Sequence, residues 1–235
     1  VVFFVGILPA FFTLWVRRAV KEPEAWQRSQ REAPVPMSAM MRGSLGRVTV
    51  ALTLMNACVL FAYWGFNSWV PSYLAAPPAQ GGVGLGVDGR TLLLVAMQVG
   101  MWFGYVTFGF VADALGRKRT YIGYLLIAAV LVFAYTTIRV PWILLLLGPF
   151  TAFFATGHFS GFGAVSAELY PTAIRARAQG LTYNIGRIVS AAAPWLVGDL
   201  SAAYGYGAAL SIAAAAFIAA SVFWVWIPET RKLTE

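Results

Sequence analysis

A single charged residue, Arg187, lies within the otherwise uncharged stretch LTYNIGRIVS. Tyr183, Asn184 and Arg187 occupy positions i, i+1 and i+4, so a helix would bring them close to one face. An arginine guanidinium binds a carboxylate through two parallel hydrogen bonds and disfavours a cation. The group therefore predicts a site for a small anion, unless Arg187 is permanently paired with an acid outside this chain.

Similar polar faces recur in two other apolar stretches. Asn56, Tyr63 and Asn67 are spaced by seven and four residues, which again places them on one helical face. Gln98 and Trp102 are four residues apart in a further stretch. We predict that these amides and aromatic rings line the same binding cavity as Arg187.

The only histidine, His158, stands in the segment TGHFSGFG. Its imidazole titrates near neutral pH, which suits a proton relay. The alternative is that His158 only hydrogen-bonds a backbone carbonyl where helices approach closely at Gly157 and Gly161.

The composition requires a lipid bilayer around the helices that position these residues. The 235 residues are 60% hydrophobic and 11% charged, with a mean hydropathy of +0.71. A soluble domain cannot bury so large an apolar fraction. Segments of about 17–25 apolar residues can each cross a bilayer as a helix. Seven segments qualify: Val1–Val16, Val48–Tyr73, Thr91–Val111, Thr120–Ile138, Trp142–Ser166, Leu181–Leu200 and Gly207–Ile227.

The first of these segments is short and begins without an initiating methionine. We therefore expect that the chain is cut inside a membrane helix and belongs to a larger protein.

The polar residues converge on one depth in this scheme. Arg187 lies ten residues beyond Arg177, which is about 15 Å along a helix and near the middle of a hydrocarbon core of about 30 Å. Asn56 and His158 fall at a similar level. A charge at that depth costs about 2.5–3.5 kcal/mol, so Arg187 should face a partner or a water-filled cavity. This level is the predicted binding layer.

Basic residues give the orientation. Of the 17 Lys and Arg residues, 14 fall in alternate loops, or in the tail, on one side. Because cytoplasmic loops are enriched in bases, the chain begins outside and ends in the cytoplasm. The same distribution, in short loops rather than on a patch, argues against nucleic-acid binding despite the pI of about 9.9.

Several other classes are excluded by what the sequence lacks. One cysteine and one histidine cannot form an intrachain disulfide or a Cys/His metal site. The chain contains no H-E-x-x-H and no G-x-S-x-G, so we expect no catalytic residues, no metal and no cofactor. A channel should show polar residues along a whole pore rather than at one depth.

Four segments carry motifs typical of one family. GFVADALGRKR (Gly109–Arg119) fits G-x-x-x-D-x-x-G-R-K/R, and AELYPTAIRARAQG (Ala167–Gly180) holds a Glu followed seven residues later by Arg. KEPEAW follows the first span and PETRK the last. In this order and on one side, they resemble the loop signatures of the major facilitator superfamily. Ala114 departs from the pattern, which has a basic residue directly after the aspartate.

The resemblance implies an all-α membrane protein with seven transmembrane helices, equivalent to helix six plus the C-terminal six-helix bundle of such a transporter. Residues 1–16 would be the transmembrane helix that ends the N-terminal half, and residues 17–47 the cytoplasmic loop between the halves. Residues 48–227 would form the six-helix bundle and residues 228–235 a cytoplasmic tail.

The segment AELYPTAIRARAQGLTYNIGR is similar to metabolite:proton symporters, including the sialate and lactate branch. This implies proton-coupled alternating access for a small organic anion such as a carboxylate, in a bacterial inner membrane. The expected partners are the solute, a proton, the lipid bilayer and the N-terminal half of the same polypeptide. A sugar or drug facilitator or antiporter of the superfamily is the alternative.

The resemblance also implies a cytoplasmic gate. Asp113 would face the positive N-terminal end of a neighbouring helix, and Arg117 and Arg119 would reach acids such as Glu168. The alternative is that the bases only fix the topology. The predicted gate residues are Gly109, Asp113, Gly116, Arg117, Glu168 and Arg175.

Overall fold

The computed structural model describes residues 8–19 and 36–230, and within these ranges it contains helices and turns but no strand. The N-terminal α-helices are α2 (Leu8–Ala19), α4 (Gly43–Ala75), α5 (Val87–Leu115) and α6 (Arg117–Thr137). The others are α7 (Pro141–Gly157), α8 (Phe162–Leu169), α9 (Thr172–Ser190), α10 (Ala193–Tyr204) and α11 (Tyr206–Phe223). Three short 3₁₀ helices join them: η1 (Met37–Met41), η2 (Pro78–Gln80) and η3 (His158–Gly161).

Five helical segments of the described chain are long and apolar enough to cross a membrane. They are α4, α5, α6, the continuous run from Pro141 to Leu169, and α11. With 33 residues, α4 is about 50 Å long, so it extends beyond a hydrocarbon core of about 30 Å. Each of the five coincides with a segment that hydropathy predicts.

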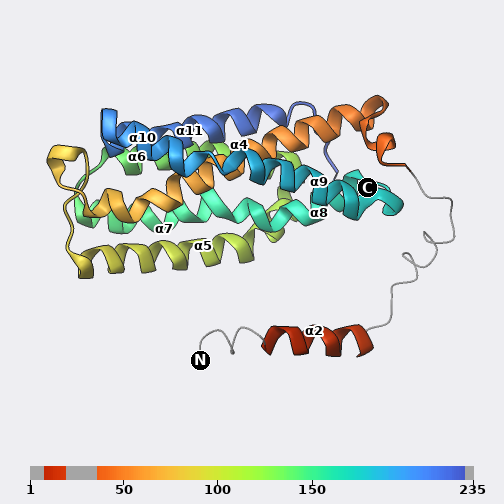
Figure 1. The fold of residues 1–235 in the computed structure, drawn as a ribbon, viewed down its shortest axis with the longest axis horizontal. Coiled ribbons are helices and arrows are strands. Elements are labelled where there is room, and N and C mark those ends of the chain that lie inside the picture. Colours follow the sequence, from red (N-terminus) through yellow and green to blue (C-terminus); the bar gives the residue numbers. More distant parts are fainter. Residues whose placement is uncertain (1–7, 20–35, 231–235) are drawn as a thin grey trace.

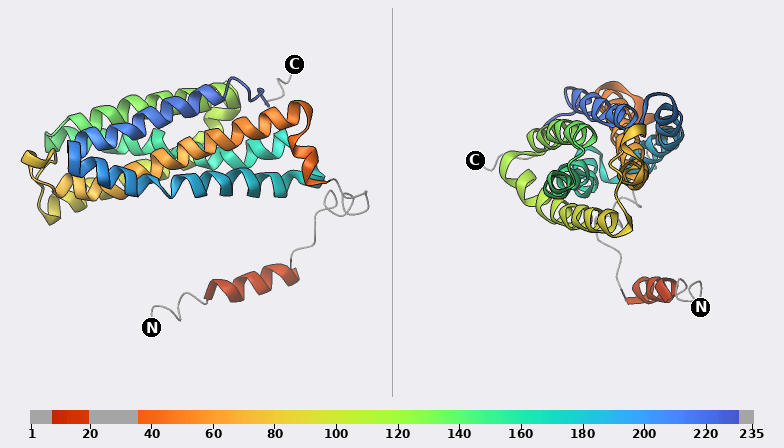
Figure 2. Two further views of the ribbon diagram at one scale, coloured as in Figure 1. Left: turned by 45° about the horizontal axis from the view of Figure 1, so that its top comes forward. Right: turned by 90° about the vertical axis from the view of Figure 1, so that its left-hand side faces the viewer.

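The helices from α4 to α11 run alongside one another in a single bundle (Figure 1). In this bundle α4 packs against α9, α10 and α11, while α6 packs against α7 and α11. Helix α7 in turn packs along α5. Helix α2 stands apart from the bundle in both views of Figure 2.

Glycines allow the close contact between α5 and α7. A Cβ at Gly104 would lie 2.5 Å from the carbonyl oxygen of Phe153, and one at Gly100 would overlap the backbone of Pro149. Small residues that let two backbones approach are a common basis of helix packing in lipid, where the hydrophobic effect does not drive association. These two glycines therefore set the distance between α5 and α7.

One predicted crossing, Leu181–Leu200, is not a single uninterrupted α-helix. Ala191 and Ala192 keep helical backbone angles, but the N–H of Ala192 donates to the carbonyl oxygen of Val189, three residues back, and the α-helical pattern is interrupted between α9 and α10. Pro194, in the first turn of α10, has no N–H, and its ring would clash with the carbonyl of Ser190 in a continuous helix. The apolar run continues across this break, so hydropathy does not detect it.

The start of the bundle also differs from expectation. Helix α4 begins at Gly43, and the residues before it form η1, whose Met40 is buried while Met37 and Met41 are exposed. The predicted N-terminal span, the loop after it and the C-terminal tail lie in part outside the described residues.

Candidate functional site

A cavity of about 570 Å³ opens between α4, α5, η3, α8 and α9. We call it the large cavity to distinguish it from a smaller one that adjoins it. Aromatic side chains dominate its wall, and its polar groups come from tyrosines, Trp64 and Gln179. The lining residues are Leu60, Tyr63, Trp64, Tyr105, Phe159, Phe162, Gly163, Ala176, Gln179, Gly180 and Tyr183.

A second cavity of about 220 Å³ lies between α4, α5, α7 and α11. We call it the side pocket. Tyr63 lines both cavities, so the two adjoin at this ring. The side pocket is lined by Tyr63, Phe66, Asn67, Pro71, Leu94, Met97, Gln98, Met101, Ala152, Ala155, Thr156 and Phe217.

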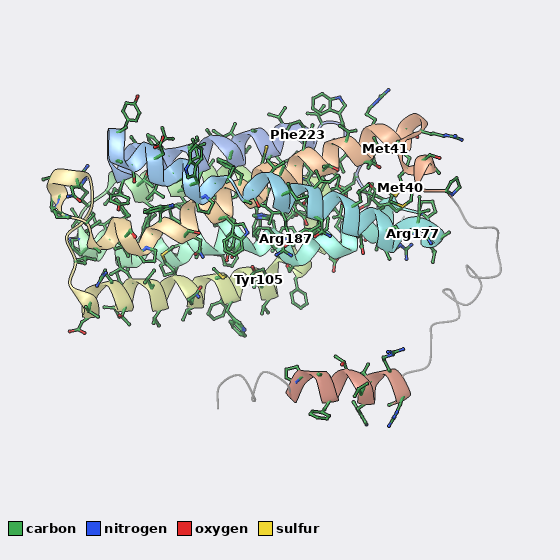
Figure 3. The ribbon with its side chains drawn as sticks, viewed as in Figure 1. Met40, Met41, Tyr105, Arg177, Arg187 and Phe223 are labelled. Atoms are coloured by element: carbon green, nitrogen blue, oxygen red, sulfur yellow. The ribbon has the colours of Figure 1, made fainter. Side chains whose placement is uncertain are left out.

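Arg187 is exposed on α9, one turn beyond Tyr183 of the large cavity. Figure 3 places Arg187 about midway along the bundle, whereas Arg177 lies near the end that holds Met40 and Met41. No acid among the described residues forms an ion pair with Arg187. Arg187 stands in the last turn of α9, where the carbonyl ends of the helix dipole favour a cation. The carbonyl end of α9 therefore favours the positive charge of Arg187, while its exposed guanidinium stays open to an anion.

Not every predicted residue joins the cavities. His158 is buried, with Nδ1 3.3 Å from the carbonyl oxygen of Phe154, and its ring packs on Phe159 at a centroid distance of 4.7 Å. Its Nε2 has no hydrogen-bond partner among the described residues. This geometry matches the carbonyl-bonded alternative, and His158 itself lines neither cavity.

Asn56 and Trp102 also lie elsewhere. Asn56 is buried where α4 meets α9, against Gly186. Trp102 is 59% exposed and stacks edge-on against Phe103. The exposed Asn184 donates its amide to the carbonyl oxygen of Gly180 at 2.7 Å. Of the predicted binding residues, Tyr63, Asn67, Gln98 and Tyr183 are the ones that line a cavity.

A cluster of charged side chains ties together α5, α6 and α8 at one end of the bundle. Arg117 pairs with Asp113 on one side and with Glu168 at 3.2 Å on the other. Glu168 also accepts a hydrogen bond from the hydroxyl of Thr230, beyond α11. The expected contact between Arg117 and Glu168 is therefore present.

The N-terminus of α6 is occupied by Glu229, a partner that sequence reasoning missed. Its carboxylate accepts the backbone N–H groups of Arg117 at 2.8 Å and Lys118 at 3.1 Å. Asp113 does not fill this position, because it is largely exposed and faces Arg117. Gly116 has φ of 98°, and a Cβ there would come within 2.8 Å of the Glu229 carboxylate. The PETRK motif contains Glu229 and was the sequence signal for this contact. Spacing alone could not show that its carboxylate would meet the N-terminus of α6.

The remaining gate residues make other contacts. Arg175 donates from Nε to the carbonyl oxygen of Tyr170 at 3.4 Å, and Arg119 forms no ion pair within the described ranges. Burial raises the pKa of Tyr170, whose hydroxyl donates to Oγ1 of Thr49 at 3.0 Å and so ties the α8–α9 loop to α4. Gly109 is exposed, with open space around its Cα.

The described residues hold no group of three or more His, Cys, Asp or Glu side chains that could bind a metal ion. The site can therefore offer a solute aromatic stacking, amide and hydroxyl hydrogen bonds, and the nearby charge of Arg187.

Comparisons with known proteins agree with these features. The family model described as "Major Facilitator Superfamily" matches residues 74–235. A "Putative metabolite transport protein" of Haemophilus influenzae is 29% identical over 97% of this chain and 58% of its own length. The "Cis,cis-muconate transport protein" of Acinetobacter baylyi is 30% identical, over 94% of this chain and 55% of its own.

The "Sialic acid transporter NanX" of Escherichia coli is 29% identical over 95% of this chain and 54% of its own. The chain thus spans about half the length of these relatives. Among solved structures, the peptide transporter POT in complex with sulfate superposes with a TM-score of 0.65 at 18% identity. That match covers 87% of this chain and 41% of the transporter, and it concerns the fold alone.

Proposed function

The chain belongs to the Major Facilitator Superfamily, and on this premise we propose that it forms the C-terminal half of a proton-coupled transporter of small organic anions. The transported solute would bind between this bundle and a preceding half of the same polypeptide. The two halves would then expose the site to each side of the membrane in turn.

The observation that carries the proposal is the large cavity together with Arg187. The cavity is bounded by α4, α5, α8 and α9 and by η3, and its volume of about 570 Å³ falls in the range of small-molecule sites. Arg187 lies one turn from the cavity residue Tyr183 and has no acidic partner among the described residues. A carboxylate would supply that partner with two hydrogen bonds.

The names of two relatives agree with an anionic solute. Muconate and sialic acid, which name the Acinetobacter and Escherichia proteins, are both carboxylic acids. Their identity to this chain is 30% and 29%, so they favour the chemical class rather than either compound.

The rest of the proposal concerns the membrane. We infer seven crossings, with α2 as part of the first and α9 with α10 as the sixth, in a bacterial inner membrane. The excess of bases on one side favours a cytoplasmic C-terminus. The acid that couples proton movement would lie in the preceding half, since neither cavity is lined by an acid of this chain.

A neutral sugar or drug is the second candidate solute. It is favoured by the wall of the large cavity, which carries aromatic rings and hydroxyls but no charged side chain. Aromatic faces and hydroxyl groups are suited to uncharged, partly apolar solutes. In this case the solute would be taken up without competition from carboxylates.

The test is uptake into proteoliposomes that contain the full-length polypeptide. Labelled dicarboxylates and sugar acids are suitable, because they cross a protein-free bilayer poorly. We expect uptake that depends on an inward proton gradient and falls at least tenfold in Arg187→Gln. Arg177→Gln is the matched control on the same helix and should transport normally. Equal transport by Arg187→Gln and wild type would contradict the anion site, and uptake of neutral sugars alone would favour the second candidate.

A further inference from the structure

The side pocket differs in chemistry from the large cavity it adjoins. None of its lining residues carries a charge, and Tyr63 is its single titratable lining residue. Its floor is apolar and buried, built from Phe66, Met97, Ala152, Ala155 and Phe217. A full charge moved into such a floor would lose its hydration without compensation. The occupant must therefore be uncharged at this end.

Two amide side chains stand at the mouth of the side pocket. Asn67 on α4 and Gln98 on α5 are both exposed and both line the pocket. Neither makes a hydrogen bond to another described residue. Each amide offers two donor hydrogens and an acceptor oxygen, so the pair can bind a neutral carbonyl or hydroxyl group.

The size of the side pocket limits what it can hold. Its volume of about 220 Å³ is below the roughly 300–1,000 Å³ of a typical drug-sized site. It exceeds the roughly 150 Å³ of an apolar cavity that holds one benzene molecule. One six-membered ring, or an unsaturated chain of similar length, matches this volume.

The walls favour a flat, unsaturated group. Phe66 and Phe217 contribute aromatic rings, and Met97 and Met101 contribute thioethers. Aromatic rings and sulfur atoms both make favourable contacts with a π system. Phe66 is itself fixed by an edge-on contact with Tyr135 at a centroid distance of 5.9 Å.

Tyr63 joins the two cavities. Its ring makes edge-on contacts with Trp64 and Phe159, each at a centroid distance of 5.4 Å. Trp64 and Phe159 line the large cavity, so a solute that reaches past Tyr63 would occupy both spaces.

We propose that the side pocket receives the uncharged, planar end of the transported anion, with Asn67 and Gln98 hydrogen-bonding to it. The carboxylate of the same solute stays in the large cavity. This inference rests on the proposed function and narrows its solutes to carboxylates that carry an unsaturated ring or chain.

Three carboxylates that differ at the uncharged end provide the test. The probes are benzoate, cyclohexanecarboxylate and acetate, and their binding is measured on the purified full-length polypeptide in nanodiscs. A binding measurement is unaffected by the passive passage of these weak acids through a bilayer. For the wild type we expect benzoate to bind at least tenfold more tightly than acetate and about fivefold more tightly than cyclohexanecarboxylate.

Variants of the side pocket should reduce this preference. Gln98→Leu removes an exposed amide without disturbing the buried floor, and we expect the benzoate-to-acetate ratio to fall about threefold to tenfold. Ala155→Leu fills the floor of the side pocket, and with this variant benzoate and acetate should bind equally tightly. Ser68→Ala, at an exposed position that lines neither cavity, should leave it unchanged.

The outcomes separate this inference from the proposed function. A benzoate preference that survives both Gln98→Leu and Ala155→Leu would overturn the inference. Equal weakening of benzoate and acetate in these variants would also overturn it, because the pocket would then act only on the fold. If no carboxylate binds the wild type, the proposed function fails as well. Arg187→Gln should weaken benzoate and acetate equally, which marks the anion site itself.

Discussion

Gly116 shows how one residue joins two distant segments. It ends α5, precedes α6 and has φ of 98° with ψ of 150°, a conformation that is nearly restricted to glycine. The lack of a side chain also leaves room for Glu229 to reach the backbone N–H groups of Arg117 and Lys118. The carboxylate there meets the positive end of the α6 dipole.

We predict that Gly116→Ala lowers the free energy of unfolding by about 1–3 kcal/mol, through backbone strain and displacement of Glu229. Thermal unfolding of the purified protein in detergent measures this. Gly123→Ala is the matched control, because it lies inside α6 with open space around its Cα and should be close to neutral. Equal melting temperatures for the two variants would show that the α6 cap contributes nothing to stability.

Residue spacing predicted only part of the candidate site. It grouped Asn56, Tyr63 and Asn67, of which Tyr63 and Asn67 line the side pocket while Asn56 is buried elsewhere. The same spacing paired Gln98 with Trp102, of which only Gln98 lines a cavity. Periodicity identifies residues that share a helical face, but the rotation of each helix against its neighbours decides which part of that face meets a cavity.

At the scale of helices, the contact between α5 and α7 depends on glycine at Gly104, whose added Cβ would meet the carbonyl of Phe153. We predict that Gly104→Ala destabilises the bundle by about 1–3 kcal/mol, because the two backbones must move apart to fit the methyl group. Chemical or thermal unfolding in detergent would measure the change.

Gly109→Ala, on the same helix with open space around its Cα, is the control for this substitution. Alanine is a better helix former than glycine, so the control should be neutral or slightly stabilising. If Gly104→Ala is no less stable than Gly109→Ala, the contact between α5 and α7 tolerates a methyl group and does not depend on Gly104.

The helices themselves were largely predictable, because long apolar runs with charged flanks identify membrane helices without further information. Hydropathy does not mark the division between α9 and α10, since the apolar run passes through Ala191 and Ala192 unchanged, and Pro194 is the sequence signal for a kink there. The placement of Arg187 in the last turn of α9 depends on that division. Its exposure and its stabilisation by a helix end were therefore beyond what hydropathy can indicate.

At the scale of the whole molecule, one charged cluster holds several helices together at the end of the bundle. Arg117 links α6 to α8 through Glu168, and Glu168 in turn holds Thr230 beyond α11. Lys118 donates to the carbonyl oxygens of Val225 and Ile227, at 3.3 and 3.1 Å. The large cavity is bounded by α8 and α9, so motion of α8 away from this cluster would change access to the cavity.

We predict that Glu168→Gln increases access to the large cavity from the end of the bundle that holds the cluster, which is the cytoplasmic end in the proposed orientation. Loss of the carboxylate weakens the contacts with Arg117 and Thr230, and a shift of about 1 kcal/mol in the conformational equilibrium changes a population about fivefold. The reporter is Ala176→Cys, which lines the cavity, placed in a background from which Cys58 and any cysteine in the rest of the polypeptide have been replaced by serine. Alkylation by a membrane-impermeant maleimide in inside-out vesicles should become about threefold to tenfold faster.

The control for this effect is Asp88→Asn, which also removes one carboxylate but lies in the first turn of α5, at the other end of the bundle. It should leave the alkylation rate of the cysteine at position 176 unchanged. If Glu168→Gln and Asp88→Asn give the same rate as the parent, the cluster stabilises the fold without controlling access. Alkylation that is faster only in Glu168→Gln, and that the proposed solute slows again, would connect the cluster to the transport cycle. The reason is that a bound solute favours one of the two conformations.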